Sequence, residues 1–383
     1  MMSEWPMVKL GEVISRVDET EQILKPEDET FVTLKLHGKG VVPRNIGDGK
    51  TPKSFRGFRV KLGQFIYSRI DARNGAFGII PAELDGAVVS KDFPVYEVDS
   101  AEIMPSILIS ICTSEHFVNQ IRSMSNGATN RQRIKEDVLE RMLIPLPPLG
   151  EQKRIAEILG RVAEAEQHVQ DTLELLDEVA KSSFYTFCGI PDHFERRKKI
   201  GEIAIVATGN TPPRKDPSNY GSYIEWIKSD NLGSIFPTPA SEFLSEEGLK
   251  RGRVAAPGSL LMTCIAGSIK SIGKCSVVNR KVAFNQQINS IKPVNNEDLY
   301  YLYLLFYVAP YLVQRRSTGG LKGIVKKSSL EMCEIPWPER KVRQMIGTFC
   351  QEWINCHLLV MHKLSLLQEL QKSLATRAFA GLL

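Results

Sequence analysis

Two long segments of the chain carry an apolar residue at every third or fourth position. The first follows the proline-rich stretch 145–148, which excludes a helix interior, and from Glu151 to Cys188 it contains one glycine and no proline. Its apolar seam is formed by Ile155, Leu159, Val162, Glu166, Val169, Leu173, Leu176, Ala180, Ser183 and Phe187. The second seam is formed by Ile346, Cys350, Trp353, His357, Val360, Leu364, Leu367, Gln371, Leu374 and Ala378. Alternating steps of four and three predict two coiled-coil helices that pack on each other.

The segments that precede these helices have a different pattern. Short apolar-alternating runs at 63–70, 75–81 and 87–98 are separated by glycine-rich turns, which is typical of strands in a compact α/β domain. Residues 106–124 have helical periodicity. A polar, basic segment at 126–133 follows and is interpreted as a loop.

The whole pattern occurs twice. Lys9-Leu10-Gly11-Glu12-Val13 returns as Lys199-Ile200-Gly201-Glu202-Ile203, and Ile144-Pro145-Leu146-Pro147 returns as Ile335-Pro336-Trp337-Pro338. A period of about 190 residues is far too long for a solenoid and indicates a duplicated domain plus helix. We therefore expect an α/β (α+β) fold with globular domains at 1–147 and 191–338 and helices at 148–190 and 339–383. The helices should pair antiparallel, with quasi-twofold symmetry.

Glu166 and His357 interrupt the two seams at equivalent places. They are either polar residues tolerated at the edge of the seam or residues that fix its register.

The net charge of +5 is unevenly distributed. Residues 248–296 contain eight basic and no acidic residues, and residues 44–73 contain eight basic residues against Asp48 and Asp71. Two basic zones suggest two surfaces for a polyanion such as DNA, although each zone is also compatible with an ordinary solvated face.

Catalytic and metal motifs are not found in the sequence. The seven cysteines form no C-x-x-C and the six histidines no H-E-x-x-H. Gly49-Lys50-Thr51 lacks the glycine that a phosphate-binding loop needs six residues before its lysine, where Arg44 stands. We expect no catalytic, cofactor or metal site in this chain. The lack of a long apolar run or secretion signal predicts a cytoplasmic protein without membrane contact.

Three segments carry a resemblance to a known family. They are Ile144-Pro145-Leu146-Pro147-Pro148-Leu149-Gly150-Glu151-Gln152-Lys153-Arg154-Ile155-Ala156-Glu157-Ile158-Leu159, then Thr208-Gly209-Asn210-Thr211-Pro212-Pro213-Arg214-Lys215-Asp216-Pro217, and Ser317-Thr318-Gly319-Gly320-Leu321-Lys322-Gly323-Ile324. Together they resemble the DNA specificity (S) subunits of Type I restriction-modification systems. Two features depart from the family pattern. The second junction, 338–346, lacks the Glu-Gln-Lys-Arg signature, and the first domain lacks the Thr-Gly-x-Thr-Pro opening.

The resemblance implies two target recognition domains that each read one half of a split, asymmetric site on double-stranded DNA. The helices would be the spacer that sets the gap between half-sites. Two modification (methyltransferase) subunits and the restriction/translocase subunits would be its partners, and S-adenosylmethionine, ATP and Mg would bind to them. The junction residues expected to contact a partner are Glu151, Gln152, Lys153 and Arg154.

Specificity would come from base edges in the major groove and affinity largely from phosphates. The candidate DNA-binding residues are Arg56, Arg69, Arg73, Arg131, Arg133, Arg214, Lys228, Asp230, Lys270, Lys322, Lys326 and Lys327. Asp230 would accept from a cytosine amino group or, alternatively, cap a turn. Two other interpretations stay open: a specificity subunit of a methylation-only or phase-variable system, and a coiled-coil scaffold that reads no DNA.

Overall fold

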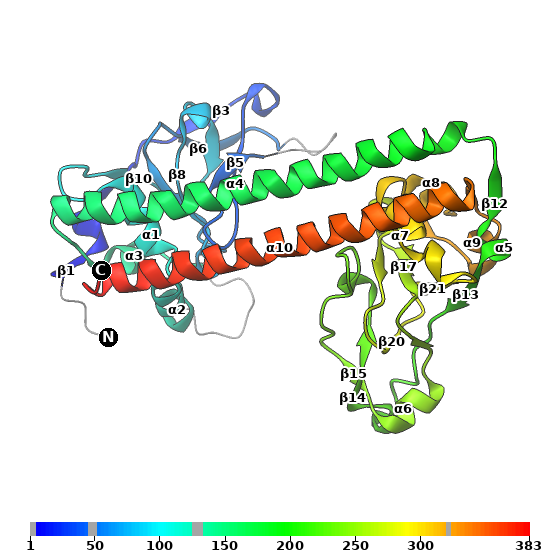
Figure 1. The fold of residues 1–383 in the computed structure, drawn as a ribbon. Helices are drawn as coiled ribbons and strands as arrows, with labels where there is room; N and C mark the ends of the chain where they lie inside the picture. The colour runs from blue at the N-terminus through cyan, green and yellow to red at the C-terminus, as the bar shows by residue number, and fades with distance from the viewer. Residues whose placement is uncertain (1–4, 45–51, 125–132, 319–322) are drawn as a thin grey trace. The chain divides into compact units, whose positions relative to one another are not determined.

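The computed structural model describes residues 5–44, 52–124, 133–318 and 323–383. It contains two compact units: unit 1 comprises residues 1–168 and 364–383, and unit 2 comprises residues 169–363. Helix α4 (Leu149–Cys188) and helix α10 (Arg340–Phe379) therefore each contribute one half to each unit (Figure 1). The division differs from the four consecutive segments expected, because each half-helix packs with the globular part at its own end.

Unit 1 is built on a four-stranded sheet in the order β2-β10-β7-β8. The sheet strands are β2 (Ile14–Arg16), β7 (Phe65–Tyr67), β8 (Phe77–Ile79) and β10 (Val95–Val98). A second sheet has the order β3-β6-β9, with β3 (Glu21–Ile23), β6 (Phe55–Arg59) and β9 (Val88–Ser90). Two strand pairs complete it: β1 (Met7–Lys9) with β11 (Leu143–Pro145), and β4 (Val32–Leu34) with β5 (Val41–Pro43). Its short helices are α1 (Pro105–Cys112), α2 (Glu115–Met124) and α3 (Glu136–Glu140).

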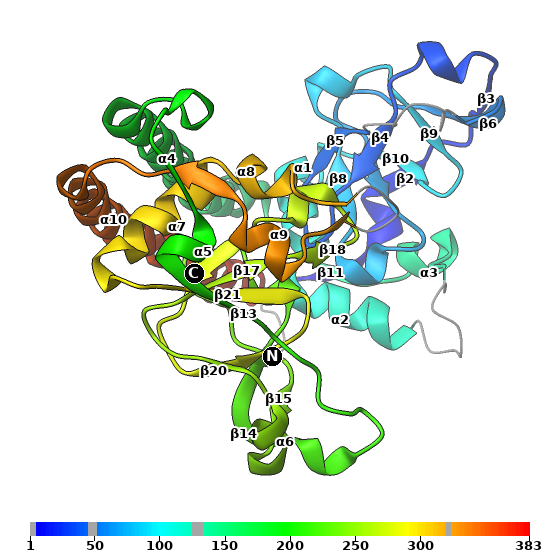
Figure 2. The ribbon, with the colours of Figure 1, turned by 90° about the vertical axis from the view of Figure 1, so that its right-hand side faces the viewer.

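Unit 2 repeats this plan with the sheet β13-β21-β17-β19. These strands are β13 (Ala204–Thr208), β17 (Leu260–Thr263), β19 (Cys275–Val277) and β21 (Ile288–Pro293). A second sheet, β15-β14-β20-β16, contains β14 (Tyr220–Ile227), β15 (Phe243–Leu244), β16 (Val254–Ala255) and β20 (Val282–Phe284). Two strand pairs remain: β12 (Arg197–Lys199) with β23 (Glu334–Pro336), and β18 (Ile265–Ala266) with β22 (Gly323–Ile324). The helices are α5 (Ile200–Ile203), α6 (Glu246–Arg251), α7 (Leu299–Val308), α8 (Tyr311–Gln314) and α9 (Lys327–Glu331). Strands β14 and β15 gather with α6 at one end of this unit (Figure 2).

The internal repeat is visible in the strand pairing. In unit 1 the first strand pairs antiparallel with the strand before α4, with Met7 opposite Pro145. In unit 2 the equivalent pair places Arg197 opposite Pro336, just before α10. Each junction thus returns the chain to the beginning of its own domain before the long helix starts.

The two seams are confirmed, and their pairing is antiparallel within each unit. In unit 1 the beginning of α4 and the end of α10 share one core, which contains Ile155, Leu159, Leu374 and Ala378. In unit 2 the indole nitrogen of Trp353, in the first half of α10, donates to the carbonyl of Leu176, in the second half of α4, at 2.9 Å.

Two details of the sequence prediction were wrong. Phe187 is exposed at the end of the α4 seam, whereas Phe184 and Cys188 are buried there. The last turns of α4 face the domain as well as α10, since the Phe184 ring stacks with Tyr301 at 6.4 Å. The helix expected over 106–124 is two helices, because the Ser114 hydroxyl accepts from the Phe117 amide and starts α2 afresh.

The polar seam residues differ in their surroundings. His357 Nε2 lies 3.5 Å from Asp177 Oδ1, and its ring lies 5.2 Å from the Trp353 ring. Burial raises the pKa of Glu166, which is consistent with a carboxyl group held inside the seam. The side-chain pair at His357 favours a register-fixing role there.

Candidate nucleic-acid interface

Two of the predicted basic residues of unit 1 are held by acidic partners far away in the sequence. Arg69 pairs with Glu136 on α3, and Arg133 lies 3.1 Å from Asp92. Arg73 belongs to a 3-10 turn, and its carbonyl accepts from Arg122. The two ion pairs order the side chains of Arg69 and Arg133, and they also reduce the net charge that the surface offers to a phosphate.

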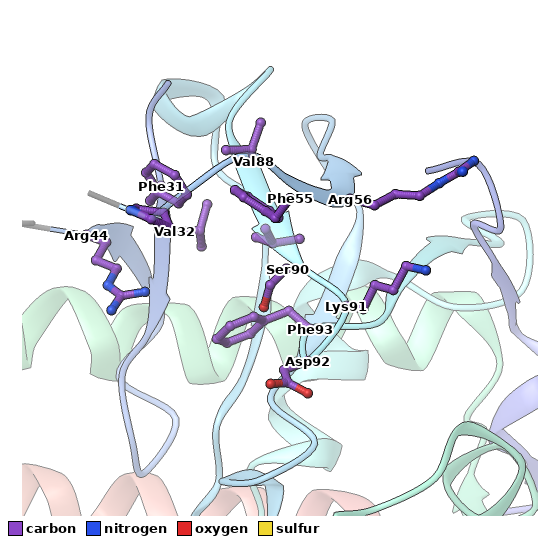
Figure 3. Close-up of a pocket in the computed structure, with 12 residues that line it drawn as sticks. Phe31, Val32, Arg44, Phe55, Arg56, Val88, Ser90, Lys91, Asp92 and Phe93 are labelled. Carbon is purple, nitrogen blue, oxygen red and sulfur yellow. The ribbon is translucent and has the colours of Figure 1, made fainter. Parts of the chain in front are cut away.

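Arg56 lies at a cavity of about 430 Å³ beside strands β6 and β9 (Figure 3). Its Nε donates to the Thr20 hydroxyl at 2.8 Å. The cavity combines apolar and basic side chains, among them Phe31, Phe55, Phe93, Arg44 and Lys91. The Phe31 and Phe55 rings lie 5.9 Å apart. This hollow joins aromatic and cationic groups, the combination that nucleic-acid surfaces use.

Two predicted residues, Arg131 and Lys322, lie outside the described residues. The neighbouring candidates of unit 2 are described. Lys270 and Lys326 are exposed, and Lys327 lies 3.5 Å from Glu331, one turn further along α9. The pairing of β18 with β22 brings the chain segments that carry Lys270 and Lys326 together, with Ile265 opposite Ile324. Unit 2 therefore assembles basic residues that are about 55 positions apart in the sequence.

Another basic group surrounds Glu242, a residue that the sequence did not single out. Arg214 Nη1 lies 2.7 Å from one Glu242 carboxylate oxygen, and Lys228 pairs with the other. The Arg214 guanidinium also lies over two rings, 4.7 Å from the centre of Tyr220 and 4.9 Å from that of Trp226. Both cations lower the pKa of the Glu242 carboxyl through their hydrogen bonds, that of Lys228 being the larger effect. We name Arg214, Lys228 and Glu242 the Glu242 cluster.

The loop that carries Arg214 is held at several points. The Tyr220 hydroxyl donates to the Pro212 carbonyl at 2.7 Å, and the Asn219 side-chain amide donates to the Pro213 carbonyl at 3.1 Å. A Cβ on Gly209 would lie 2.1 Å from the Asn285 carbonyl oxygen, so this motif position requires glycine.

Asp230 is exposed in the 3-10 turn Ser229–Asn231, where Asn231 supplies the side chain that accepts from the Lys228 amide. The side chain that caps this turn is therefore that of Asn231 and not that of Asp230.

Among the junction residues, Gln152 is fully buried and does not face a partner. Its amide donates to the carbonyls of Glu102 and Pro147, and its Oε1 accepts from the Met104 amide, each at 2.8 Å. Gln152 thereby fixes the beginning of α4 to the domain. The structure assigns this side chain an internal role, because all of its donors and its acceptor point into unit 1.

Arg343 occupies the equivalent place in unit 2. Its Nη1 donates to the Pro338 carbonyl five residues earlier, as Gln152 does to Pro147. Its Nε donates to Asp298 at 2.7 Å, and its guanidinium lies 4.1 Å from the Trp337 ring centre. At the second junction, a buried ion pair of Arg343 and Asp298 takes the place of the glutamine of the missing signature.

The other three junction residues lie at the surface. Lys153 is exposed, and Arg154 bonds to Glu151 and to the Leu383 carbonyl at 2.8 Å each. Lys153 borders a hollow of about 510 Å³ along α4, whose other lining residues are Met104, Ala156, Glu157, Gly160, Arg161 and Glu164. Apart from the backbone of α4 itself, no atom of the described residues lies within 4 Å of the position that a Cβ on Gly160 would occupy. The packing within unit 1 therefore gives no reason for a glycine in mid-helix, where it costs about 1 kcal/mol relative to alanine.

The described residues contain no group of three or more His, Cys, Asp or Glu side chains placed to hold a metal ion. They also contain no helix long and apolar enough to cross a membrane. Six of the seven cysteines are buried, and burial raises the pKa of the Cys264 and Cys275 thiols to about 12. A thiol with so high a pKa is unsuited to act as a nucleophile at neutral pH.

The chain is similar in sequence to known proteins. The chain is 22% identical to the Type I restriction enzyme HindI specificity subunit of Haemophilus influenzae, with 89% of this chain and 91% of that protein covered. It is 31% identical to the MjaIX specificity subunit of Methanocaldococcus jannaschii over 39% of this chain and 36% of that protein.

Among solved structures, the S subunit of a Type I restriction-modification system from M. genitalium matches with a TM-score of 0.51 and 13% identity, covering 98% of this chain and 96% of that one. A chain from a study of complex assembly and conformational transition of the type I R-M system also has a TM-score of 0.51, at 22% identity, covering 99% and 98%. Both likenesses concern the fold.

The family match is itself twofold, since it covers residues 2–175 and again residues 191–369. The chain belongs to the family of the Type I restriction modification DNA specificity domain.

Proposed function

We propose that this chain is the non-catalytic subunit that reads a two-part DNA target for a Type I restriction-modification complex. The observation that carries the proposal is the duplicated domain, with one sheet of the same strand order in each unit and different basic groups around it. Two related domains with different side chains suit an asymmetric target, because each half-site is read by its own set of donors and acceptors.

The proposal includes partners that supply the chemistry. Two modification subunits would bring S-adenosylmethionine, and restriction/translocase subunits would bring ATP and Mg, in the cytoplasm. The chain itself would contribute recognition and positioning. The family membership supports this division of labour and speaks against a scaffold that reads no DNA.

The test is sequencing of methylated bases in cells that express the chain with its modification subunits. We expect methylation at one bipartite sequence with a constant gap, and none in cells that lack this chain. Methylation that persists without the chain, or that follows a single continuous site, would contradict the proposal. Restriction of unmodified DNA in the same cells separates a complete system from a methylation-only one.

We further propose that the hollow along α4 receives a modification subunit at Gly160. Replacing Gly160 by Leu should leave the melting temperature of the isolated chain unchanged or higher, because leucine favours a helix and the site is open. The same change should weaken binding of the modification subunit at least tenfold, since a bulky side chain would fill the contact. Titration calorimetry measures the affinity.

Gly160→Ala is the matched control, because it restores helix propensity with a single methyl group. It should raise stability with a much smaller effect on partner binding than leucine. Equal partner affinity of the Gly160→Leu variant and the wild-type chain would remove this surface from the interface.

A further inference from the structure

The Glu242 cluster differs from an ordinary surface ion pair, because a single carboxylate contacts two cations. One carboxylate holds two cations from different parts of the chain: Arg214 from the loop before β14, and Lys228 just after it. The charges of the three groups sum to +1, so the cluster stays attractive to an electron-rich partner. Arg214 is also the outer member, with 55% of its side chain exposed.

The aromatic rings restrict where the guanidinium of Arg214 can lie. Arg214 lies within 5 Å of the ring centres of both Tyr220 and Trp226, and these two rings meet edge to face at 5.9 Å. Trp226 is buried, so it cannot shift to follow the arginine. A guanidinium that lies close to two rings and is held by a carboxylate at one nitrogen loses conformational freedom before any ligand arrives.

The remaining donors of Arg214 are available to a ligand. A guanidinium has five N–H donors, and within the described part of the chain the Glu242 pair is the polar contact that Arg214 makes. Oriented donors in one plane match two acceptors side by side, such as O6 and N7 of guanine or two phosphate oxygens. We take the base as the ligand, because O6 and N7 of guanine are two acceptors fixed in the plane of one ring, which suits a guanidinium held in place beforehand.

We infer that Glu242 is a positioning residue that aims Arg214 at a guanine in the half-site read by unit 2. The inference rests on the proposed function and adds the residue pair and the base that they recognise. Lys228 reinforces the arrangement from the other side, because it binds the second carboxylate oxygen and lies 5.5 Å from the Trp226 ring centre.

The test uses the complete methyltransferase complex and duplexes in which each guanine of the target is replaced, one at a time, by 7-deazaguanine. For the wild-type complex we expect one guanine of the unit 2 half-site whose loss of N7 weakens binding by about fivefold to a hundredfold. In the Glu242→Gln and Arg214→Lys variants, the duplex with 7-deazaguanine at this position should bind almost as tightly as the unmodified duplex. The penalties at all other guanines should stay unchanged in both variants.

Glu225→Gln is the matched control. Glu225, in β14, holds Arg280 through a similar pair, with Nη2 of Arg280 2.9 Å from Oε1 of Glu225. This variant tests the loss of a carboxylate–guanidinium pair elsewhere and should keep the wild-type penalty profile.

Two results would overturn the inference. One is an equal loss of affinity of Glu242→Gln for every duplex, with a lower salt slope, which would identify a phosphate contact. The other is a profile identical to that of the wild type. A wild-type complex without any sequence preference would instead refute the proposed function, so the two failures are distinguishable.

Discussion

Replacing Arg343 by Ala is expected to lower the free energy of unfolding of unit 2 by about 3–5 kcal/mol, because it leaves a buried carboxylate without its counter-ion. The side chains of Arg343 and Asp298 are only 10% and 5% exposed, and their atoms lie 2.7 Å apart. The substitution would also remove the cation above the Trp337 ring and the donor to the Pro338 carbonyl. Thermal and denaturant unfolding of the full chain, followed by the fluorescence of its tryptophans, measure the loss.

Arg340→Ala is the control for this experiment, since Arg340 lies three residues earlier in the same helix and makes an exposed pair with Glu297. Its removal should leave the melting temperature nearly unchanged. The double variant Arg343→Gln with Asp298→Asn should recover much of the stability, because no charge stays buried and glutamine does the equivalent work at position 152. Equal stability of the Arg343→Ala and Arg340→Ala variants would contradict the role given to this ion pair.

The helices and the repeat were predictable because they depend on periodic, local patterns. A seam with steps of three and four indicates a helix that packs along that seam. In the structure, all members of the second seam from Ile346 to Ala378 are buried or half-buried. The equivalent roles of Gln152 in unit 1 and Arg343 in unit 2 were not predictable. The two side chains differ in charge and size, and their shared role depends on partners that only the fold brings near, such as Met104 and Asp298.

The candidate site was predicted less well, for an equally physical reason. Counting basic residues along the chain finds Arg69, Arg214 and Lys228, but it does not find the acids that neutralise them. Glu136 is 67 positions from Arg69, and it comes from a different element. Glu242 precedes a two-residue strand and has no sequence signal that distinguishes it from any surface glutamate. A basic stretch in the sequence is therefore a weaker guide to DNA contact than the paired and unpaired cations of the fold.

Inserting one heptad into both long helices is expected to lengthen the gap between the two half-sites of the DNA target. The insertions would stand between His168 and Val169 and between Lys363 and Leu364, where the chain passes from one unit to the other. Seven residues add about 10.5 Å of helix, so the gap should grow by at most about three base pairs of roughly 3.4 Å each. The half-site sequences should stay the same, because the domains that read them are unchanged. Methylated-base sequencing reports both half-sites and the gap in one measurement.

Whole heptads in both helices preserve the seam, whereas four residues added near Val169 in α4 alone shift Leu173 and Leu176 against their partners on α10. The single insertion should therefore cost stability, because α4 and α10 can no longer keep the register of both their paired halves, of which the bond from Trp353 to the Leu176 carbonyl is one contact. Comparing the two variants separates the length of the helices from the integrity of their pairing. If the double heptad variant is as stable as the wild type and methylates the original sequence with the original gap, the helices do not set that gap.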